Sequence, residues 1–151
     1  MNETRVKTTD LVRVTQELWR DMLSLDLIPV PAATPKLTSG IVAFVQIGGE
    51  WTGTVRLDIS TELAREAAAA FLGVAAKQVS PDQMGDTAGE LANITGGSVK
   101  ALVPAPSKLS LPVVAVAADY TVDGKGIPRL VQSVFRYGGE NLVVTILEGG
   151  E

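Results

Sequence analysis

Residues 80–102 read SPDQMGDTAGELANITGGSVKAL, and this stretch carries the clearest helix signals in the chain. It opens with Ser80, Pro81, Asp82 and Gln83, which supply an N-cap, a proline at the first helical position, an acid in the first turn and the glutamine of a capping box. We therefore predict a helix over residues 80–102. Because one side of it is apolar, the helix requires a second apolar surface to pack on.

The two sides of this predicted helix carry different chemistry. Successive residues lie about 100° apart around a helix axis, so Asp86, Glu90, Asn93 and Gly97 share one stripe about 60° wide. We expect Glu90 and Asn93 to be exposed on that stripe. The opposite side holds the residues that we expect to pack on the rest of the protein: Met84, Ala88, Leu91, Thr95, Val99 and Leu102.

Glycine is frequent in the middle of this helix, at positions 85, 89, 96 and 97. Each glycine inside a helix costs about 1 kcal/mol relative to alanine. The glycines therefore suggest that a ligand, another backbone of this domain or a second copy of the chain comes close to the helix. Spacing alone also fits an ordinary surface helix, whose Asp, Glu and Asn side chains contact only water.

Two more helices are predicted from the sequence. Apolar residues recur every three or four positions from Leu11 to Leu25, which predicts a helix over residues 8–26, ended by the stretch 29–35 that contains several prolines. The residues of its apolar stripe are Leu11, Val14, Leu18, Met22 and Leu25. An alanine-rich helix is expected over residues 61–72, with Ser60 as its N-cap and Gly73 in the left-handed position after its end.

Most of the remaining chain favours strands. An apolar run at residues 41–47 and an alternating pattern at residues 51–59 predict a hairpin with its turn at Gly48-Gly49. Further strands are expected at residues 113–120, 130–137 and 142–147, with turns at Asp123-Gly124 and Gly138-Gly139. Trp19 and Trp51 are expected in the core.

The order helix, two strands, two helices, three strands indicates the fold class. Strands joined by short turns pair antiparallel, and the helices need the apolar face of their sheet. We expect an α+β two-layer sandwich, with helices on one face of a mostly antiparallel sheet. A length of 151 residues fits a single domain over residues 1–151.

Composition excludes several kinds of chemistry. The chain has no His and no Cys, which rules out a Ser-His-Asp triad, a cysteine nucleophile, a thiolate or imidazole metal site and a disulfide framework. A net charge of -4 without a basic cluster makes nucleic acid an unexpected partner. Catalysis by this chain would have to rely on carboxylates, amides, hydroxyls or amines.

The sequence predicts no insertion into a membrane. The longest strongly apolar stretch, Leu111 to Ala118, is far shorter than the roughly 20 residues that span a bilayer. The polar N-terminus, MNETRVKTTD, lacks the apolar segment of a signal peptide. We expect a cytoplasmic protein.

The stripe on the 80–102 helix also resembles a known motif. Asp86, Glu90 and Asn93, within GDTAGELANITGGSVKALV, resemble the Asp/Ser, three residues, Glu, two residues, Asn motif of the CheC/CheX/FliY class of chemotaxis phosphatases. ELANITGGSVK is closest to CheX-like domains, and residues 41–73 are similar to them as well. The motif continues with a proline that is separated from the Asn by about 22 residues, where this chain has Val116; the nearest proline is Pro112.

The resemblance implies a function and a partner. Members of the class hydrolyse the phospho-aspartate of CheY-like response regulators, so Asn93 would orient the attacking water and Glu90 would pair with the active-site Lys of the receiver domain. We expect Asp86 and Gly97 to contact the partner, although Asp86 could instead orient Glu90 or contact only water. The resemblance also implies that this chain binds no cofactor or metal, that Mg²⁺ belongs to the receiver, and that the chain forms a homodimer through paired sheet edges.

Two other interpretations remain open. The domain could bind a receiver without catalysis, as an adaptor or scaffold, or the glycine-rich helix could be a dimer contact with an incidental polar stripe. A second copy of the motif at Asp58, Glu62 and Arg65 is not expected, because an arginine replaces the amide.

Overall fold

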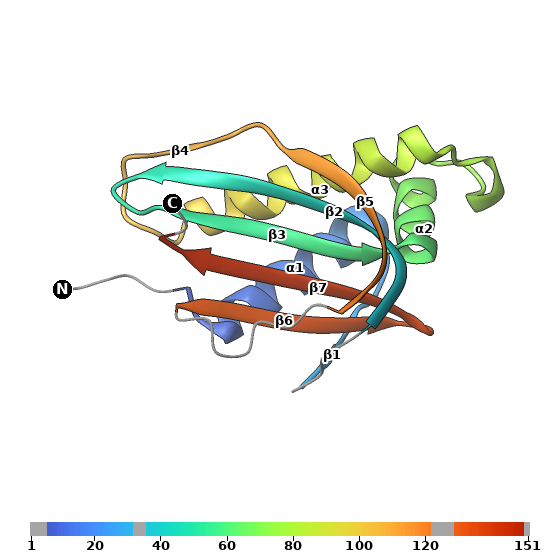
Figure 1. Ribbon diagram of the computed structural model, residues 1–151, viewed down its shortest axis with the longest axis horizontal. Helices are drawn as coiled ribbons and strands as arrows, with labels where there is room; N and C mark the ends of the chain where they lie inside the picture. Colours follow the sequence, from blue (N-terminus) through green and yellow to red (C-terminus); the bar gives the residue numbers. More distant parts are fainter. Residues whose placement is uncertain (1–5, 32–35, 122–128, 150–151) are drawn as a thin grey trace.

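The computed structural model describes residues 6–31, 36–121 and 129–149. Three α-helices and seven strands occupy these ranges, together with a short 3₁₀ helix, η1 (Ala76–Gln78) (Figure 1). The α-helices are α1 (Thr8–Leu23), α2 (Thr61–Leu72) and α3 (Pro81–Lys100). The strands are β1 (Ile28–Val30), β2 (Lys36–Gly49), β3 (Gly53–Ser60), β4 (Ser107–Leu109), β5 (Val113–Thr121), β6 (Leu130–Tyr137) and β7 (Glu140–Glu148).

The strands form one sheet in the order β1-β6-β7-β3-β2-β4, and β5 pairs with β2 beside β4. Each of the described strand pairs is antiparallel. The 14-residue β2 is long enough to pair with two different strands along one side: β5 along its first part and β4 at its end. The predicted fold class, an α+β sandwich with a mostly antiparallel sheet, is confirmed.

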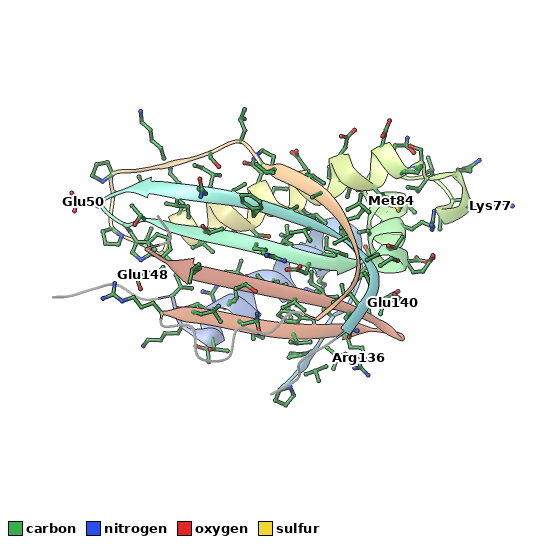
Figure 2. All side chains as sticks on the ribbon, in the orientation of Figure 1. Glu50, Lys77, Met84, Arg136, Glu140 and Glu148 are labelled. Carbon is green, nitrogen blue, oxygen red and sulfur yellow. The ribbon has the colours of Figure 1, made fainter. Side chains whose placement is uncertain are left out.

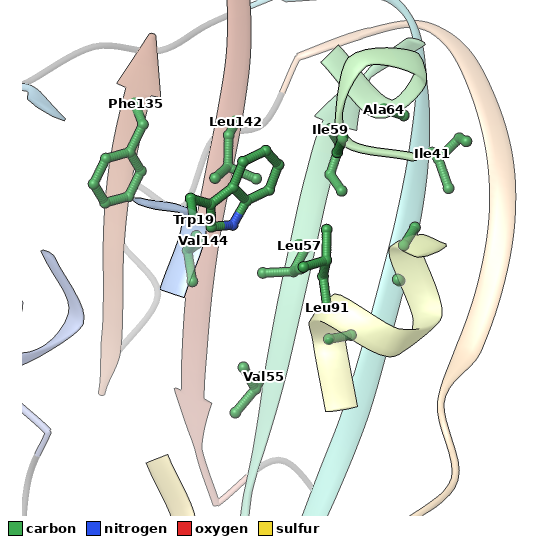
Figure 3. Packing of buried hydrophobic residues seen from close by; sticks show 14 of the residues in the cluster. Trp19, Ile41, Val55, Leu57, Ile59, Ala64, Leu91, Phe135, Leu142 and Val144 are labelled. Atoms are coloured by element: carbon green, nitrogen blue, oxygen red, sulfur yellow. The ribbon is translucent and has the colours of Figure 1, made fainter. Parts of the chain in front are cut away.

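The helices lie behind one face of the sheet (Figure 1). Strand residues alternate between the two faces, so Val55, Leu57 and Ile59 of β3 all point toward the helices and are fully buried. Figure 3 shows Trp19 of α1 beside Leu142 and Val144 of β7, in the same apolar layer. The core is therefore the space between the sheet and the helices, and Trp19 is part of it, as predicted.

Trp51 is also buried, although it lies in the turn before β3 and not within the strand. Its indole Nε1 donates a hydrogen bond to Oε2 of Glu148, at 3.1 Å, and Glu148 ends β7 (Figure 2). This bond lets the indole N–H stay paired while the ring packs in the core.

The start of α3 has the predicted capping box. Ser80 Oγ accepts a hydrogen bond from the Gln83 N–H at 3.1 Å, and Gln83 Oε1 accepts one from the Ser80 N–H at 2.9 Å. Pro81 is the first helical residue. The helix begins where the sequence predicts because these side chains pair two N–H groups that helix geometry leaves without partners.

The first helix ends earlier than predicted. α1 stops at Leu23 because Ser24 adopts a left-handed conformation, with φ of 57°, and Leu25 N donates to the carbonyl of Trp19. The expected apolar stripe is also only partly buried. Met22 is exposed because, with the half-buried Leu18, it lines an open groove between α1 and the end of α3. Leu102, predicted to be buried, lines the same groove and is half-buried.

The hairpin turn differs from the prediction. β2 continues through Gly48 and Gly49, which pair with β4, and the turn follows at residues 50–52. Gly49 has a φ of 134°, and a Cβ there would lie 2.4 Å from the carbonyl oxygen of Pro106. Glycine is thus required at position 49 because the chain that enters β4 passes close to it. The sequence did not predict β4, and the glycine pair was therefore assigned to the turn.

The second helix has its predicted length, 61–72, and Gly73 ends it with a φ of 71°. Ser60, however, does not cap it through its side chain. Ser60 Oγ donates to Oε1 of Glu140 and accepts from the N–H of Asn141, which ties the end of β3 to β7.

Two short strands, β1 and β4, were not predicted, whereas β3, β5, β6 and β7 lie within a few residues of their predicted positions. The turn expected at Gly138-Gly139 is present. The turn expected at Asp123-Gly124 lies outside the described residues.

Candidate functional site on helix α3

The predicted stripe of polar residues lies on the outer side of α3. Asp86, Glu90 and Gly97 are exposed, and Met84, Leu91 and Val99 on the opposite side are buried. Figure 2 labels Met84 near the start of the helix. Because Glu90 and Asn93 are three residues apart on one helix, their side chains are neighbours, about 5–6 Å apart at Cβ. The geometry of this pair is therefore fixed by a single helical turn.

Asn93 is half-buried, not fully exposed as predicted. The chain from the end of β4 to the start of β5 runs close to this part of the helix. A Cβ on Gly89, four residues before Asn93, would lie 3.6 Å from Cγ of Pro112, and one on Gly96, three residues after it, 2.9 Å from Cδ1 of Leu109. This segment thus passes beside the turn that carries Asn93.

The side chains of the stripe have no partners among the residues that the structure describes. Within the part of the chain that the structure describes, Asp86, Glu90 and Asn93 form no side-chain hydrogen bond and no ion pair. By contrast, Glu62 on the neighbouring helix α2 pairs with Arg65 at 3.3 Å. The carboxylate of Glu90 can accept hydrogen bonds from a partner, and the amide of Asn93 can donate and accept at once.

Acidic residues repeat along the first half of this side of the helix. Asp82, Asp86 and Glu90 are spaced four residues apart, and all three are exposed. Like charges at this spacing destabilise a helix by about 0.2–0.5 kcal/mol per pair, although the positive end of the helix dipole favours acids in the first turn. A cation that approaches Glu90 would relieve this repulsion. Asp82 was predicted only as a helix-start signal, and its spacing with Asp86 could have placed it on this row.

The glycines of α3 have separate roles. Gly85 and Gly89 face Val114 of β5: a Cβ on Gly89 would lie 3.2 Å from Val114, which is tight, whereas one on Gly85 would make an ordinary contact at 3.7 Å. Gly96 sits over the sheet, where a Cβ would lie 2.5 Å from Cγ2 of Val45. A Cβ on Gly97 would meet no atom within 4 Å, so this glycine leaves open space on the stripe. Gly89 and Gly96 thus serve packing within this domain.

Pro112 is the residue that departs from the expected motif spacing, and it lies close to the stripe. Its ring faces Gly89, the residue immediately before Glu90. In the sequence, the apolar stretch that begins at Leu111 is notable only for being too short to span a membrane. In the structure, it borders the candidate site.

The stretch with Asp58, Glu62 and Arg65 does not form a second site. Asp58 belongs to β3, and its buried carboxylate is held by Arg56 of the same strand through two contacts of 2.8 Å. Glu62 and Arg65 lie on α2 and pair with each other. These three residues therefore lie on two different elements and share no exposed helical stripe.

The described residues contain neither a candidate metal cluster nor a candidate membrane span. No group of three or more acidic side chains lies close enough together to hold a metal ion in residues 6–31, 36–121 and 129–149. None of the helices in those ranges is both long and apolar enough to cross a membrane.

Comparison with known families assigns the chain to one of them over a region that includes this helix. The family model described as chemotaxis phosphatase CheX matches residues 41–134, which include all of α3 and more than half of the chain. The chain belongs to the CheX family. A search of curated protein sequences gave no match.

Solved structures agree with the CheX assignment. A CheC-like superfamily protein from Shewanella sp. PV-4 is similar with a TM-score of 0.76 and 18% identity, over 99% of this chain and 100% of the other. Chemotaxis protein CheX from Vibrio vulnificus is similar with a TM-score of 0.73 and 17% identity, over 91% and 95% of the two chains. At these identities the likeness establishes the CheX-like fold.

A third similar structure contains a partner protein. It is the complex of CheX with CheY, BeF3 and Mg²⁺ from Borrelia burgdorferi, with a TM-score of 0.66 and 16% identity, over 95% of this chain and 99% of the other. A CheX protein of this fold therefore forms a complex with CheY.

Proposed function

We propose that this CheX-family domain hydrolyses the phospho-aspartate of a CheY-like response regulator. The observation that carries the proposal is the pair Glu90 and Asn93, one turn apart on the outer side of α3, without partners among the described residues. The family match and the CheX–CheY complex of a similar structure support a CheY-like partner. In the reaction, water attacks phosphorus, the bond to the aspartate oxygen breaks, and a carboxylate and inorganic phosphate result.

Asn93 is the proposed catalytic residue that holds the water. Phosphoryl transfer depends mainly on positioning the nucleophile and neutralising charge, so a strong base is not essential. A carboxamide suits this task because its oxygen accepts a hydrogen bond from water while its NH₂ group donates to the phosphoryl oxygens. Asn93 is half-buried, which restricts the side-chain positions available to it before the partner binds.

Glu90 has a different role in this proposal. Its exposed carboxylate pairs with the active-site Lys of the receiver domain and so sets the register in which Asn93 reaches the acyl phosphate. Asp86 and Gly97 contact the receiver on either side of this pair. The chain itself supplies no cofactor, and the Mg²⁺ that neutralises phosphoryl charge belongs to the receiver.

Substitution of Asn93 tests the proposal. Asn93→Ala should abolish stimulated dephosphorylation and leave receiver binding within about twofold, because the amide acts on water in the transition state. The measurement is loss of phosphate from phosphorylated receiver domains of the same organism, with the chain in catalytic amounts. Gln46→Ala is the matched control, since Gln46 is an exposed amide on the opposite face of the sheet and should be neutral.

The control outcomes separate the alternatives. Near wild-type turnover in Asn93→Ala would exclude the role of this amide. If the wild-type chain binds phosphorylated receiver but does not shorten its lifetime, the domain is a receiver-binding adaptor without catalysis.

We further propose that residues 1–151 act as one CheX-like domain in the cytoplasm, as a homodimer joined at sheet edges. Unpaired strand edges offer backbone N–H and C=O groups to a second copy. Light scattering at tens of micromolar should give about twice the 15.8 kDa chain mass. A mass near 15.8 kDa would exclude the dimer.

A further inference from the structure

The segment that leads into β5 exposes large apolar side chains. Leu111 is 86% exposed and Val116 is 81% exposed, which are the highest values among the large apolar residues that the structure describes. Single exposed apolar residues are common on protein surfaces, but a contiguous group beside a functional site is typical of an interaction surface. Pro112, Val114 and Val116 follow one another at alternate positions, Leu111 directly precedes Pro112, and we name these four residues the apolar ledge.

Strand register shows which side of the sheet the ledge faces. Val114 pairs with Ala43 and Val116 with Ile41, two β2 residues that are buried under the helices. Val114 and Val116 therefore point toward the helical side of the sheet. Val113, which pairs with Phe44, points to the opposite side.

The ledge is in contact with the helix of the candidate site. Cβ atoms built on Gly85 and Gly89 would lie 3.7 and 3.2 Å from the methyl groups of Val114, and Pro112 also faces Gly89. Gly89 directly precedes Glu90. Figure 1 shows β5 curving along the part of the sheet that lies in front of the first half of α3. The polar stripe and the apolar ledge are thus adjacent parts of one surface.

The stripe alone is too small for a specific protein interface. A stable complex buries about 800 Å² on each partner, with an apolar centre and a polar rim. Asp86, Glu90, Asn93 and Gly97 supply a single polar row, so any protein bound to that row must also rest on its flanks. The β5 flank offers the apolar area that the row lacks.

We propose that the apolar ledge is a docking surface for the receiver domain, and that it binds an apolar patch of the receiver beside its phosphorylated aspartate. This inference rests on the proposed function, because the receiver is placed by Glu90 and Asn93. The ledge supplies binding energy in both the ground state and the transition state, so it lowers KM without changing kcat. It also limits the approach of bulk water to Asn93 from the β5 side.

Two matched variants, one on the ledge and one on the opposite face of β5, test the ledge. Leu111→Ser with Val116→Ser removes two apolar side chains that are more than 80% exposed, so the fold should be retained. Val113→Ser makes the same change on the opposite face of the same strand, at a residue that is 50% exposed. Binding is measured by titration with a CheY-like receiver of the same organism, activated by beryllium fluoride and Mg²⁺, and turnover with the phosphorylated receiver.

The double variant should bind the activated receiver at least about tenfold more weakly, with a KM raised by a similar factor and kcat within about twofold. Val113→Ser should stay within about twofold of wild type in all three quantities. Equal affinities of the double variant and wild type would overturn the inference. An unchanged affinity together with a halved mass in light scattering would also overturn it and assign the ledge to a second copy of the chain.

The same data separate this inference from the proposed function. If Asn93→Ala has no effect on turnover, or wild type shows none, the catalytic proposal fails, but the titration still reports on the ledge. If Asn93→Ala abolishes turnover and the double variant behaves as wild type, the ledge alone fails.

Discussion

At the scale of single residues, the candidate site separates two tasks between neighbouring side chains. The amide at Asn93 bears no charge and holds water through hydrogen bonds, whereas the carboxylate at Glu90 attracts a cation. Both side chains lie without internal partners among the described residues, so neither has to break a bond before a receiver binds. The two residues should therefore respond differently to changes of charge and of salt.

Glu90→Gln keeps the size of the side chain and removes its charge. We expect weaker binding of the activated receiver, by about five- to tenfold, and a smaller loss of affinity between about 0.05 and 0.5 M salt than wild type shows. Affinity titrations at several salt concentrations measure both effects. Glu66→Gln is the control, because Glu66 is an exposed glutamate on α2 and lies outside the stripe. An unchanged affinity in Glu90→Gln would remove the charge pairing from the proposal.

At the scale of the element, two adjacent glycines of α3 predict opposite effects on stability. Replacing either with alanine improves helix propensity by up to about 1 kcal/mol. At Gly96 the new methyl group would lie 2.5 Å from buried Val45, which cannot move freely, so overpacking outweighs the gain. At Gly97 the methyl group enters open space.

Gly96→Ala should therefore lower the free energy of unfolding by about 1 kcal/mol, and Gly97→Ala should raise it by a few tenths to about 1 kcal/mol. Urea unfolding followed by circular dichroism measures both values. A stabilised Gly96→Ala would mean that α3 can move away from the sheet.

The elements also differ in how well the sequence predicts them. The start of α3 is predicted closely because it depends on hydrogen bonds between Ser80 and Gln83. These two residues are close in the sequence, so the capping box can be recognised from four consecutive residues. β4 was missed because its pairing with residues 47–49 depends on the path of the chain after α3. No sequence pattern near β4 indicates that long-range pairing. The predicted exposure of Asn93 was also too high, and the segment that passes beside its turn lies well beyond it in the chain.

At the scale of the whole molecule, the absence of histidine and cysteine has a consequence for pH dependence. Those side chains are the ones that ordinarily titrate between pH 5 and 9, and the amide of Asn93 does not titrate. The saturated rate of receiver dephosphorylation should change little between about pH 6 and 8.5, after subtraction of the receiver's own hydrolysis. A steep change of the rate with pH near neutrality would show that a titrating group takes part in catalysis. That result would exclude the water-positioning role of Asn93.

The sheet and its loops do not set the separation of the two proposed site residues. Glu90 and Asn93 share one turn of α3, so their separation is a property of helical geometry and not of the tertiary fold. A substitution elsewhere can destabilise the domain or weaken a partner contact, but it cannot change the spacing of these two side chains while the helix persists. Selection for the spacing then falls on a few positions of α3, and the rest of the chain is free to diverge as long as its sheet still supports that helix.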